Sequence, residues 1–221
     1  MRHFTFAVAT LLGLAGPIPA LTGGAAAAAA SEPEVGPVRS LLELRQEKVV
    51  VQRWDLSCGA AALATIMRYQ YNESVSEKQV AIGMLHRDEY LSDPSSLAAR
   101  GGFSMLDMKR FVDRRGYQGI GYGGLKLQDL IKISPVIVPV VFFGYPHFVV
   151  FRGVYQHRVL LADSGYGNRT MPIAEFEQAW QEQLGFVVRQ RGHSSPPNQL
   201  TVDPDEFLVP AAAAIRAAAL Q

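Results

Sequence analysis

The sequence predicts an α+β domain in which N-terminal helices pack on an antiparallel sheet. In the first half of the chain, apolar residues recur at helical spacing behind helix-starting serines. In the second half, short β-branched and aromatic runs are separated by glycine-containing turns. The connections between these runs are too short for the crossovers that parallel strands require, so neighbouring strands are expected to pair antiparallel.

Three helices are expected before the strands. The first begins at Ser57, a capping-type residue, and runs through an alanine-rich apolar stretch that indicates a buried helix. The second covers Ser76–Leu85, and its Ser-x-x-Gln start has the spacing of a capping box. The third opens at Ser104 and stops before Gly116.

The strands follow a short helical stretch near Leu125–Lys132. They are expected over Val136–Phe143, Phe148–Val154, Arg158–Ala162 and Phe186–Val188, all rich in β-branched or aromatic residues. A late helix is expected over Glu175–Trp180.

Both ends of the chain differ in composition from the part between them. A basic start, a twelve-residue apolar run and then prolines and small residues form the three-part layout of a secretory signal. The run is shorter than the roughly 18 apolar residues of a membrane-spanning helix, so a cleaved signal peptide is predicted, with an uncleaved anchor as the alternative. The predicted organisation is a signal peptide (1–30), a linker (31–40), the domain (41–190) and a Pro-rich and Ala-rich tail (191–221).

Composition excludes several classes of protein. The 21 Lys and Arg residues against 20 Asp and Glu give a net charge of +1, which removes the electrostatic case for a nucleic-acid binder or a polybasic membrane binder. A single cysteine, Cys58, allows neither an intramolecular disulfide nor a cysteine-based zinc site. The histidines lack metal-ligand spacing, and the G-x-G-x-x-G match at 119–124 follows no apolar strand. No metal or cofactor is therefore expected.

Four residues have the chemistry of a cysteine hydrolase. Cys58 is placed in the first turn of a helix, where free N–H groups and the helix dipole favour a thiolate. Six residues upstream, Gln52 offers an amide that can donate to an oxyanion. His147 is a candidate base at the mouth of a strand, and a tight hairpin would bring Asp163, sixteen residues later, alongside its imidazole. Each residue alone has an ordinary structural explanation, so the combination carries the hypothesis.

These residues also carry a resemblance to a known family. The chain is similar to the bacteriocin-processing (double-glycine leader) family of papain-like cysteine peptidases over about residues 48–190. The similar segments are Gln52–Ala61, Gly102–Met108, His147–Val150 and Leu161–Asn168. The resemblance implies a papain-like fold, with Cys58 as nucleophile, His147 as general base, Asp163 as its orienter and Gln52 in the oxyanion hole. Many members have Asp-Pro where this chain has Asp163-Ser164.

Together these observations predict a stand-alone secreted cysteine endopeptidase that acts on an exported peptide or protein substrate. The expected location is periplasmic or secreted, with no stable membrane insertion once the leader is removed and with association with a secretion system as an option. The rival from another class is a non-catalytic peptide-binding module on the same fold, and a third option is amide hydrolysis or transpeptidation on another substrate. Substrate identity, double-glycine specificity and oligomeric state stay open.

Overall fold

The computed structural model describes residues 40–85, 95–99 and 101–201 of the 221-residue chain. The predicted signal peptide, nearly all of the predicted linker and the alanine-rich end of the predicted tail lie outside the described residues. Among the residues that are described, no helix has the length and apolar character needed to cross a membrane.

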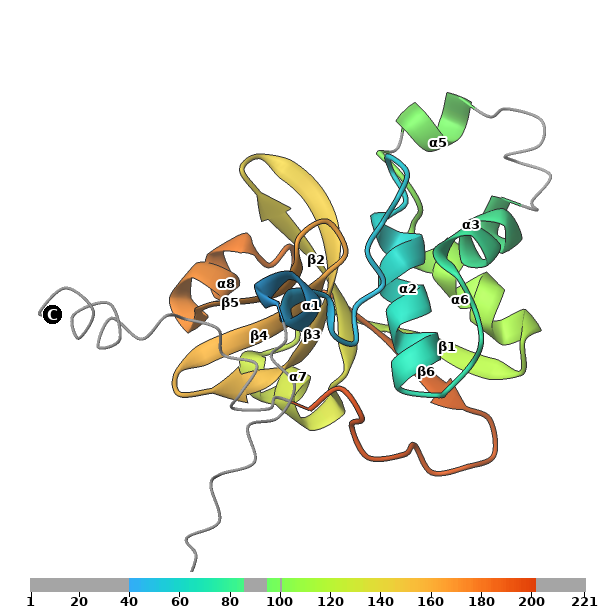
Figure 1. The fold of residues 1–221 in the computed structure, drawn as a ribbon. Coiled ribbons are helices and arrows are strands. Elements are labelled where there is room, and N and C mark those ends of the chain that lie inside the picture. Colours follow the sequence, from blue (N-terminus) through green and yellow to red (C-terminus); the bar gives the residue numbers. More distant parts are fainter. Residues whose placement is uncertain (1–39, 86–94, 100, 202–221) are drawn as a thin grey trace, which may run out of the picture. The chain divides into compact units, whose positions relative to one another are not determined.

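Most of the described helices precede the strands along the chain, as the α+β class predicts. The helices are α1 (Leu41–Gln46), α2 (Cys58–Tyr69), α3 (Glu77–Leu85), α5 (Ser95–Ala99), α6 (Met105–Arg114), α7 (Leu127–Ile133) and α8 (Ile173–Ala179). The strands are β1 (Tyr117–Tyr122), β2 (Val136–Phe142), β3 (Tyr145–Tyr155), β4 (Arg158–Asp163), β5 (Gly167–Pro172) and β6 (Gly185–Gln190). They form one six-stranded sheet in the order β1-β6-β2-β3-β4-β5, with every pairing antiparallel (Figure 1). The predicted fold class is confirmed.

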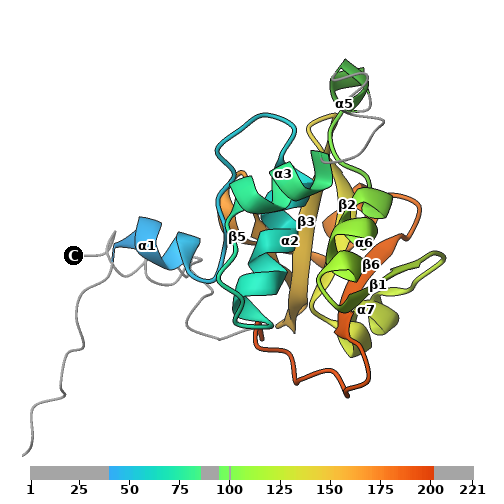
Figure 2. The ribbon, with the colours of Figure 1, turned by 90° about the vertical axis from the view of Figure 1, so that its right-hand side faces the viewer.

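The alanine-rich helix α2 occupies the centre of one core. It packs on β3 and against α3 and α6 (Figure 2), because its small side chains let it approach these elements closely. Its larger residues Leu63, Ile66 and Met67 are fully buried and meet Ile137 and Val150 from the sheet. Burying a side chain of this size contributes about 1.5–3 kcal/mol, so this core fixes α2, and Cys58 at its start, against the sheet.

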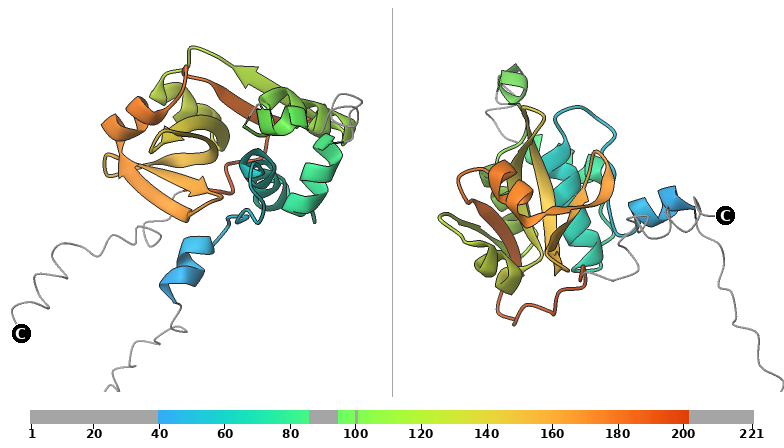
Figure 3. Two further views of the ribbon diagram at one scale, coloured as in Figure 1. Left: turned by 90° about the horizontal axis from the view of Figure 1, so that it is seen from above. Right: turned by 90° about the vertical axis from the view of Figure 1, so that its left-hand side faces the viewer.

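A second core lies on the other face of the sheet. Val138, Val149 and Phe151 point into it, because successive residues of a strand face opposite sides. Leu130 of α7 and Phe176 of α8 belong to the same core. Figure 3 shows the sheet and its helices from two further sides. The sheet is therefore anchored on both faces, which makes its strands a rigid support for side chains at their ends.

The predicted helix starts agree with the structure in two cases and differ in one. Ser104 and Asp107 form a capping box at α6, with Asp107 N–H donating to Ser104 Oγ at 3.2 Å. Ser76 and Gln79 pair in the same manner before α3. Ser57 precedes α2 as predicted, but its side chain makes no capping hydrogen bond. Four elements within the described ranges had not been predicted: α1, α5, β1 and β5.

Contacts of the domain continue past residue 190, where the predicted domain ends. Leu200 is fully buried, and the guanidinium of the buried Arg152 donates to the carbonyl oxygens of Leu200 at 3.0 Å and Thr201 at 3.1 Å. Asn198 also donates to the Arg152 carbonyl oxygen at 2.9 Å. A buried arginine needs acceptors for its N–H groups, and the segment after β6 supplies them.

Candidate active site

Cys58 is the first residue of α2 and is buried at 9% exposure. Burial raises the pKa of its thiol, but a hydrogen bond to His147, the N–H groups of Phe148 and Gly59, and the charge of the imidazole outweigh burial and lower it. Gly59 permits this arrangement, because a Cβ at that position would lie 3.4 Å from the Phe148 ring and 2.7 Å from Met108. The start of α2 can therefore approach β3 closely, and the thiolate is favoured there.

His147 is the third residue of β3, inside the strand rather than ahead of it as expected from the sequence. Its Nε2 lies 2.8 Å from Oδ1 of Asp163, which leaves Nδ1 as the ring nitrogen for the Cys58 sulfur. Burial lowers the pKa of His147, but the hydrogen bonds and charges of Asp163 and Cys58 raise it to about 9. The imidazole is therefore held in its charged form beside a thiolate.

Asp163 ends β4, and the strand register brings it to the imidazole. Val149 pairs with Asp163, so His147 is the diagonal neighbour of Asp163 on the same face of the hairpin. Burial raises the pKa of this carboxyl, but it stays lowered because the carboxylate binds His147, the Gly165 N–H at 2.8 Å and Arg169 at 2.9 Å. The contact expected from the hairpin is present, and the carboxylate remains charged.

Arg169 in β5 is a member of this cluster that sequence reasoning missed. Its guanidinium lies 4.5 Å from the ring centre of Phe142 and 5.2 Å from that of Tyr166, in addition to its ion pair with Asp163. The two rings hold the guanidinium on the carboxylate through cation–π contacts. Only the pairing of β5 with β4 brings Arg169 there, and β5 had not been predicted.

Gln52 is fixed by Ser164, the residue that follows Asp163. The Gln52 backbone N–H donates to the Ser164 carbonyl oxygen at 2.8 Å, and the Ser164 hydroxyl donates to Gln52 Oε1 at 3.0 Å. Because the amide oxygen is engaged, the side-chain N–H₂ group is left to donate elsewhere. Ser164 is 1% exposed, so this clamp is part of the buried structure around the cluster.

The other histidine weighed as a base lies elsewhere. His157 is in the turn between β3 and β4, with a left-handed backbone at φ 61°. His147 lies ten residues earlier in β3, and Asp163 is at the far end of β4. The predicted remoteness of His157 from the cluster is confirmed.

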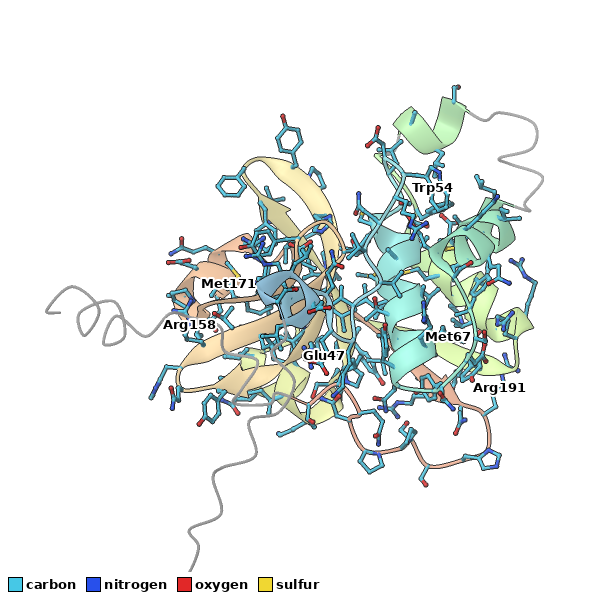
Figure 4. All side chains as sticks on the ribbon, in the orientation of Figure 1. Glu47, Trp54, Met67, Arg158, Met171 and Arg191 are labelled. Atoms are coloured by element: carbon cyan, nitrogen blue, oxygen red, sulfur yellow. The ribbon has the colours of Figure 1, made fainter. Side chains whose placement is uncertain are left out.

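An apolar groove of about 310 Å³ begins beside the start of α2. Its apolar lining comes from Trp54, Leu56, Ile82, Leu85, Leu97 and Phe103. Ser57, the residue before Cys58, also lines it, so the groove lies at the start of the helix that carries Cys58. Figure 4 shows Trp54 at the N-terminal end of α2 and Arg158 at the turn end of the β3–β4 hairpin.

Comparisons with known proteins match most of the chain to one family. Residues 46–191 match the model of the peptidase C39 family. Two curated relatives, both named probable functional amyloid protease FapD, are 38% identical over 170 residues in Pseudomonas aeruginosa and 37% identical over 171 residues in Pseudomonas fluorescens. Each alignment covers 74% of this chain and 73% of the relative.

Two solved structures share the fold. One is a double glycine motif protease from an AMS/PCAT transporter in complex with the leader peptide, with a TM-score of 0.52, 24% identity and coverage of 64% of this chain and 90% of that one. The other is the peptidase domain of Streptococcus ComA, with a TM-score of 0.52, 18% identity and coverage of 65% and 98%. The family match across the described core and the identity to the curated relatives establish that the chain belongs to the peptidase C39 family of cysteine proteases.

Proposed function

We propose that this chain is an exported cysteine endopeptidase that processes an exported polypeptide, with Cys58, His147, Asp163 and Gln52 as its catalytic residues. The observation that carries the proposal is the single buried cluster in which His147 contacts both Cys58 and Asp163. It supplies a nucleophile, a proton carrier and an orienting carboxylate, which are the parts that peptide hydrolysis by a thiol requires.

The reaction proceeds in two halves. The Cys58 thiolate attacks the peptide carbonyl carbon, and a C–S bond forms while the carbonyl oxygen becomes an oxyanion that accepts from the Gln52 amide and the Cys58 N–H. The His147 imidazolium then gives its proton to the leaving amine, and the C–N bond breaks. In the second half, the neutral imidazole takes a proton from water, whose hydroxide cleaves the thioester and frees Cys58.

Removal of the oxyanion donor provides a test of this assignment. Gln52→Ala is expected to lower kcat on the order of 10²-fold, because one hydrogen bond to the developing charge is lost in the transition state. KM should change little, and the rate of Cys58 alkylation by iodoacetamide should stay at the wild-type value because the thiolate is intact. Steady-state kinetics check this, and wild-type kcat in the variant would exclude Gln52 from the site.

The apolar groove at the start of α2 supports a polypeptide over a small amide as the substrate. A small amide would contact only the catalytic cluster. An extended polypeptide has further residues on one side of the cleaved bond, and these can bind the apolar side chains of the groove, such as Leu56 and Ile82. The names of the two Pseudomonas relatives support an amyloid-forming exported polypeptide as this substrate. Its cleavage releases two polypeptide segments and needs no cofactor.

A charge placed in the groove tests the polypeptide proposal. Ile82→Glu is expected to raise KM for the polypeptide by about 10-fold or more, because a carboxylate replaces apolar contact, while kcat stays near wild type. Leu106→Glu is the matched control, since Leu106 on α6 is a similarly exposed apolar residue (50% against 41% for Ile82) and does not line the groove. Equal KM values in the two variants would argue against the groove as a substrate site.

Export is part of the proposal and rests on the apolar run and small residues of the first thirty positions. The exported chain is expected to begin between about Leu21 and Ser31, because a twelve-residue run cannot span a hydrocarbon core of roughly 30 Å. N-terminal sequencing of the extracytoplasmic fraction checks this. A chain that still starts at Met1, or that is confined to the cytoplasm, would contradict it.

The substrate itself can be found by comparing strains. Extracytoplasmic proteins are collected from strains that produce the wild-type chain or its Cys58→Ser variant, and their N-termini are sequenced. The expected result is one exported polypeptide that accumulates uncut in the variant strain and is cut when purified wild-type protein is added. Identical N-termini in both strains would instead favour the non-catalytic binding module.

A further inference from the structure

The Asp163 carboxylate is shared between two side chains that can carry positive charge. Its Oδ1 atom accepts from His147 Nε2 and from the Gly165 N–H, each at 2.8 Å. Its Oδ2 atom accepts from the Arg169 guanidinium at 2.9 Å. The Asp163 side chain is 4% exposed, so solvent ions screen these charges little. One buried negative charge therefore serves both the imidazolium and the guanidinium.

The guanidinium of Arg169 is fixed on this carboxylate by its surroundings. Arg169 pairs with Leu161 in the β4–β5 ladder, so it is the diagonal neighbour of Asp163 on the same face of the sheet. The ring centres of Phe142 and Tyr166 lie 4.5 and 5.2 Å from the guanidinium. An arginine keeps its positive charge in proteins, so this charge stays beside Asp163 throughout the reaction.

Charged groups from three elements act on the His147 imidazole. Burial lowers the pKa of His147, but Asp163 of β4 and Cys58 of α2 outweigh burial and raise it to about 9. Arg169 of β5 lies behind Asp163, at the other oxygen of its carboxylate. Among the residues that the structure describes, Arg169 is thus the cation that contacts the carboxylate holding the imidazole.

The balance of these charges changes once the enzyme has been acylated. In the proposed reaction, the Cys58 thiolate has become a neutral thioester and the leaving amine has taken the proton of His147. The imidazole must next accept a proton from water, so it has to be neutral, whereas the Asp163 carboxylate favours the charged form. With the thiolate gone, Arg169 is placed to offset this effect of the carboxylate.

We propose that Arg169 is a positioning residue that shares the Asp163 carboxylate with His147 and so leaves the imidazole able to accept a proton from water in the second half of the reaction. The inference rests on the proposed function, because it concerns a step of that reaction. Removal of the guanidinium leaves the hydrogen bonds from His147 and Gly165 to Asp163 in place, so the carboxylate stays charged. Its whole charge then acts on the imidazole and favours the imidazolium.

The test titrates His147 in the exported chain after its single cysteine has been alkylated with iodoacetamide. Alkylation turns the thiolate into a neutral thioether, so the charges match those of the acyl-enzyme and no substrate is needed. The ring signals of His147, assigned with a His147→Gln variant, are followed by NMR against pH. Arg169→Met is expected to raise the pKa of His147 by about half a pH unit or more. Arg169→Lys should leave it close to wild type, because lysine keeps the positive charge.

Arg115→Met is the matched control for Arg169→Met. Arg115 also pairs with a carboxylate, that of Glu73 at 2.6 Å, and its guanidinium lies 5.5 Å from the ring centre of Phe111. It makes these contacts at the end of α6, away from the catalytic cluster. Loss of this charge should leave the pKa of His147 at the wild-type value.

A second measurement follows the reaction itself, with the polypeptide found by the strain comparison. At neutral pH, Arg169→Met should hydrolyse its thioester about 3-fold more slowly or worse, because a shift of half a pH unit reduces the neutral fraction of His147 by that factor. More acyl-enzyme should therefore accumulate than in wild type. It is detected as an intact mass increased by that of the N-terminal product less one water. Equal amounts in the two chains would overturn the role in this step.

The titration also distinguishes charge sharing from a supporting role of Arg169. A pKa of His147 that is lowered in Arg169→Met would overturn the inference, because it would show that Arg169 only holds Asp163 in place. An unchanged pKa, or an Arg169→Lys variant that behaves like Arg169→Met, would overturn it as well. Should Arg169→Met not fold, Arg169→Gln removes the same charge and allows the same titration. A raised pKa in a chain that does not cleave the polypeptide would support the charge sharing and contradict the proposed function instead.

Discussion

Replacement of Cys58 by serine is expected to lower kcat/KM for peptide hydrolysis by at least about 10⁴-fold. A serine hydroxyl stays protonated beside His147, whereas the thiol pKa is lowered by the imidazole and by the Phe148 and Gly59 N–H groups. The site is arranged for a thiolate already present in the resting enzyme, and the variant has no group to replace it. Hydrolysis of the polypeptide found by the strain comparison, followed by mass spectrometry, measures the loss.

Folding provides the control for this variant. Serine is close in volume to cysteine and Cys58 makes no disulfide, so thermal unfolding of Cys58→Ser should stay close to wild type. Wild-type protein should also react with iodoacetamide at pH 6 much faster than an ordinary thiol, because the thiolate is the reactive form. Substantial turnover by the serine variant would show that another residue is the nucleophile.

The helical half of the fold was predictable because its signals are local. The capping box at Ser104 and the apolar residues behind it lie within one short segment and specify α6 without reference to the rest of the chain. The same holds for β2 and β3, whose β-branched runs meet at the turn Phe143–Gly144. Elements of this kind carry their own start and stop signals.

The missed strands depend on distant partners. In β1, Gly119 has no side chain because a Cβ there would come within 2.9 Å of Lys109 and Val112 of α6. The sequence therefore shows a glycine-rich run where the fold has a strand. The strand β5 contains Asn168, Arg169 and Thr170 and no apolar run, and it forms because it pairs along the whole of β4. Tertiary contact overrides propensity in both cases.

The site also combines contacts that the local sequence predicts with contacts that depend on distant parts of the chain. A single hairpin predicts that His147 meets Asp163, because strand register converts sequence distance into position. Arg169 and Ser164 join the cluster only through β5 and through the loop that carries Gln52. Nothing in the local sequence marks these residues. The clamp on Gln52 needs the Ser164 hydroxyl, which no apolar residue at that position could supply.

Asp163 sets the pH range in which the site can work. The wild-type profile of kcat/KM should rise as the thiolate forms, at a lower pH than an ordinary thiol ionises, and fall near pH 9 as His147 loses the proton that the leaving amine needs. Burial alone would lower the pKa of His147, and Asp163 is the first of the groups that reverse this effect. Without that carboxylate, the imidazolium is no longer favoured.

Asp163→Asn is therefore expected to lower kcat by about 10³- to 10⁴-fold and to narrow the pH profile from both sides. On the alkaline side, the pH at which kcat/KM falls should move from about 9 toward 6.5, the ordinary pKa of histidine. The buried imidazole loses its negative partner and keeps the positive charge of Arg169 nearby. On the acid side, the pH at which kcat/KM rises should increase, because a neutral imidazole stabilises the Cys58 thiolate less than a charged one.

Asp113→Asn is the matched control for Asp163→Asn. The carboxylate of Asp113 also has a lowered pKa, accepts a backbone N–H from Gly119 and pairs with Lys109, but it belongs to α6 and lies outside the cluster. Loss of this carboxylate should leave the pH dependence of kcat/KM unchanged on both the acid and the alkaline side. If kcat/KM of Asp163→Asn still falls only near pH 9, a group other than Asp163 maintains the charge on His147. The role given to Asp163 would then be wrong.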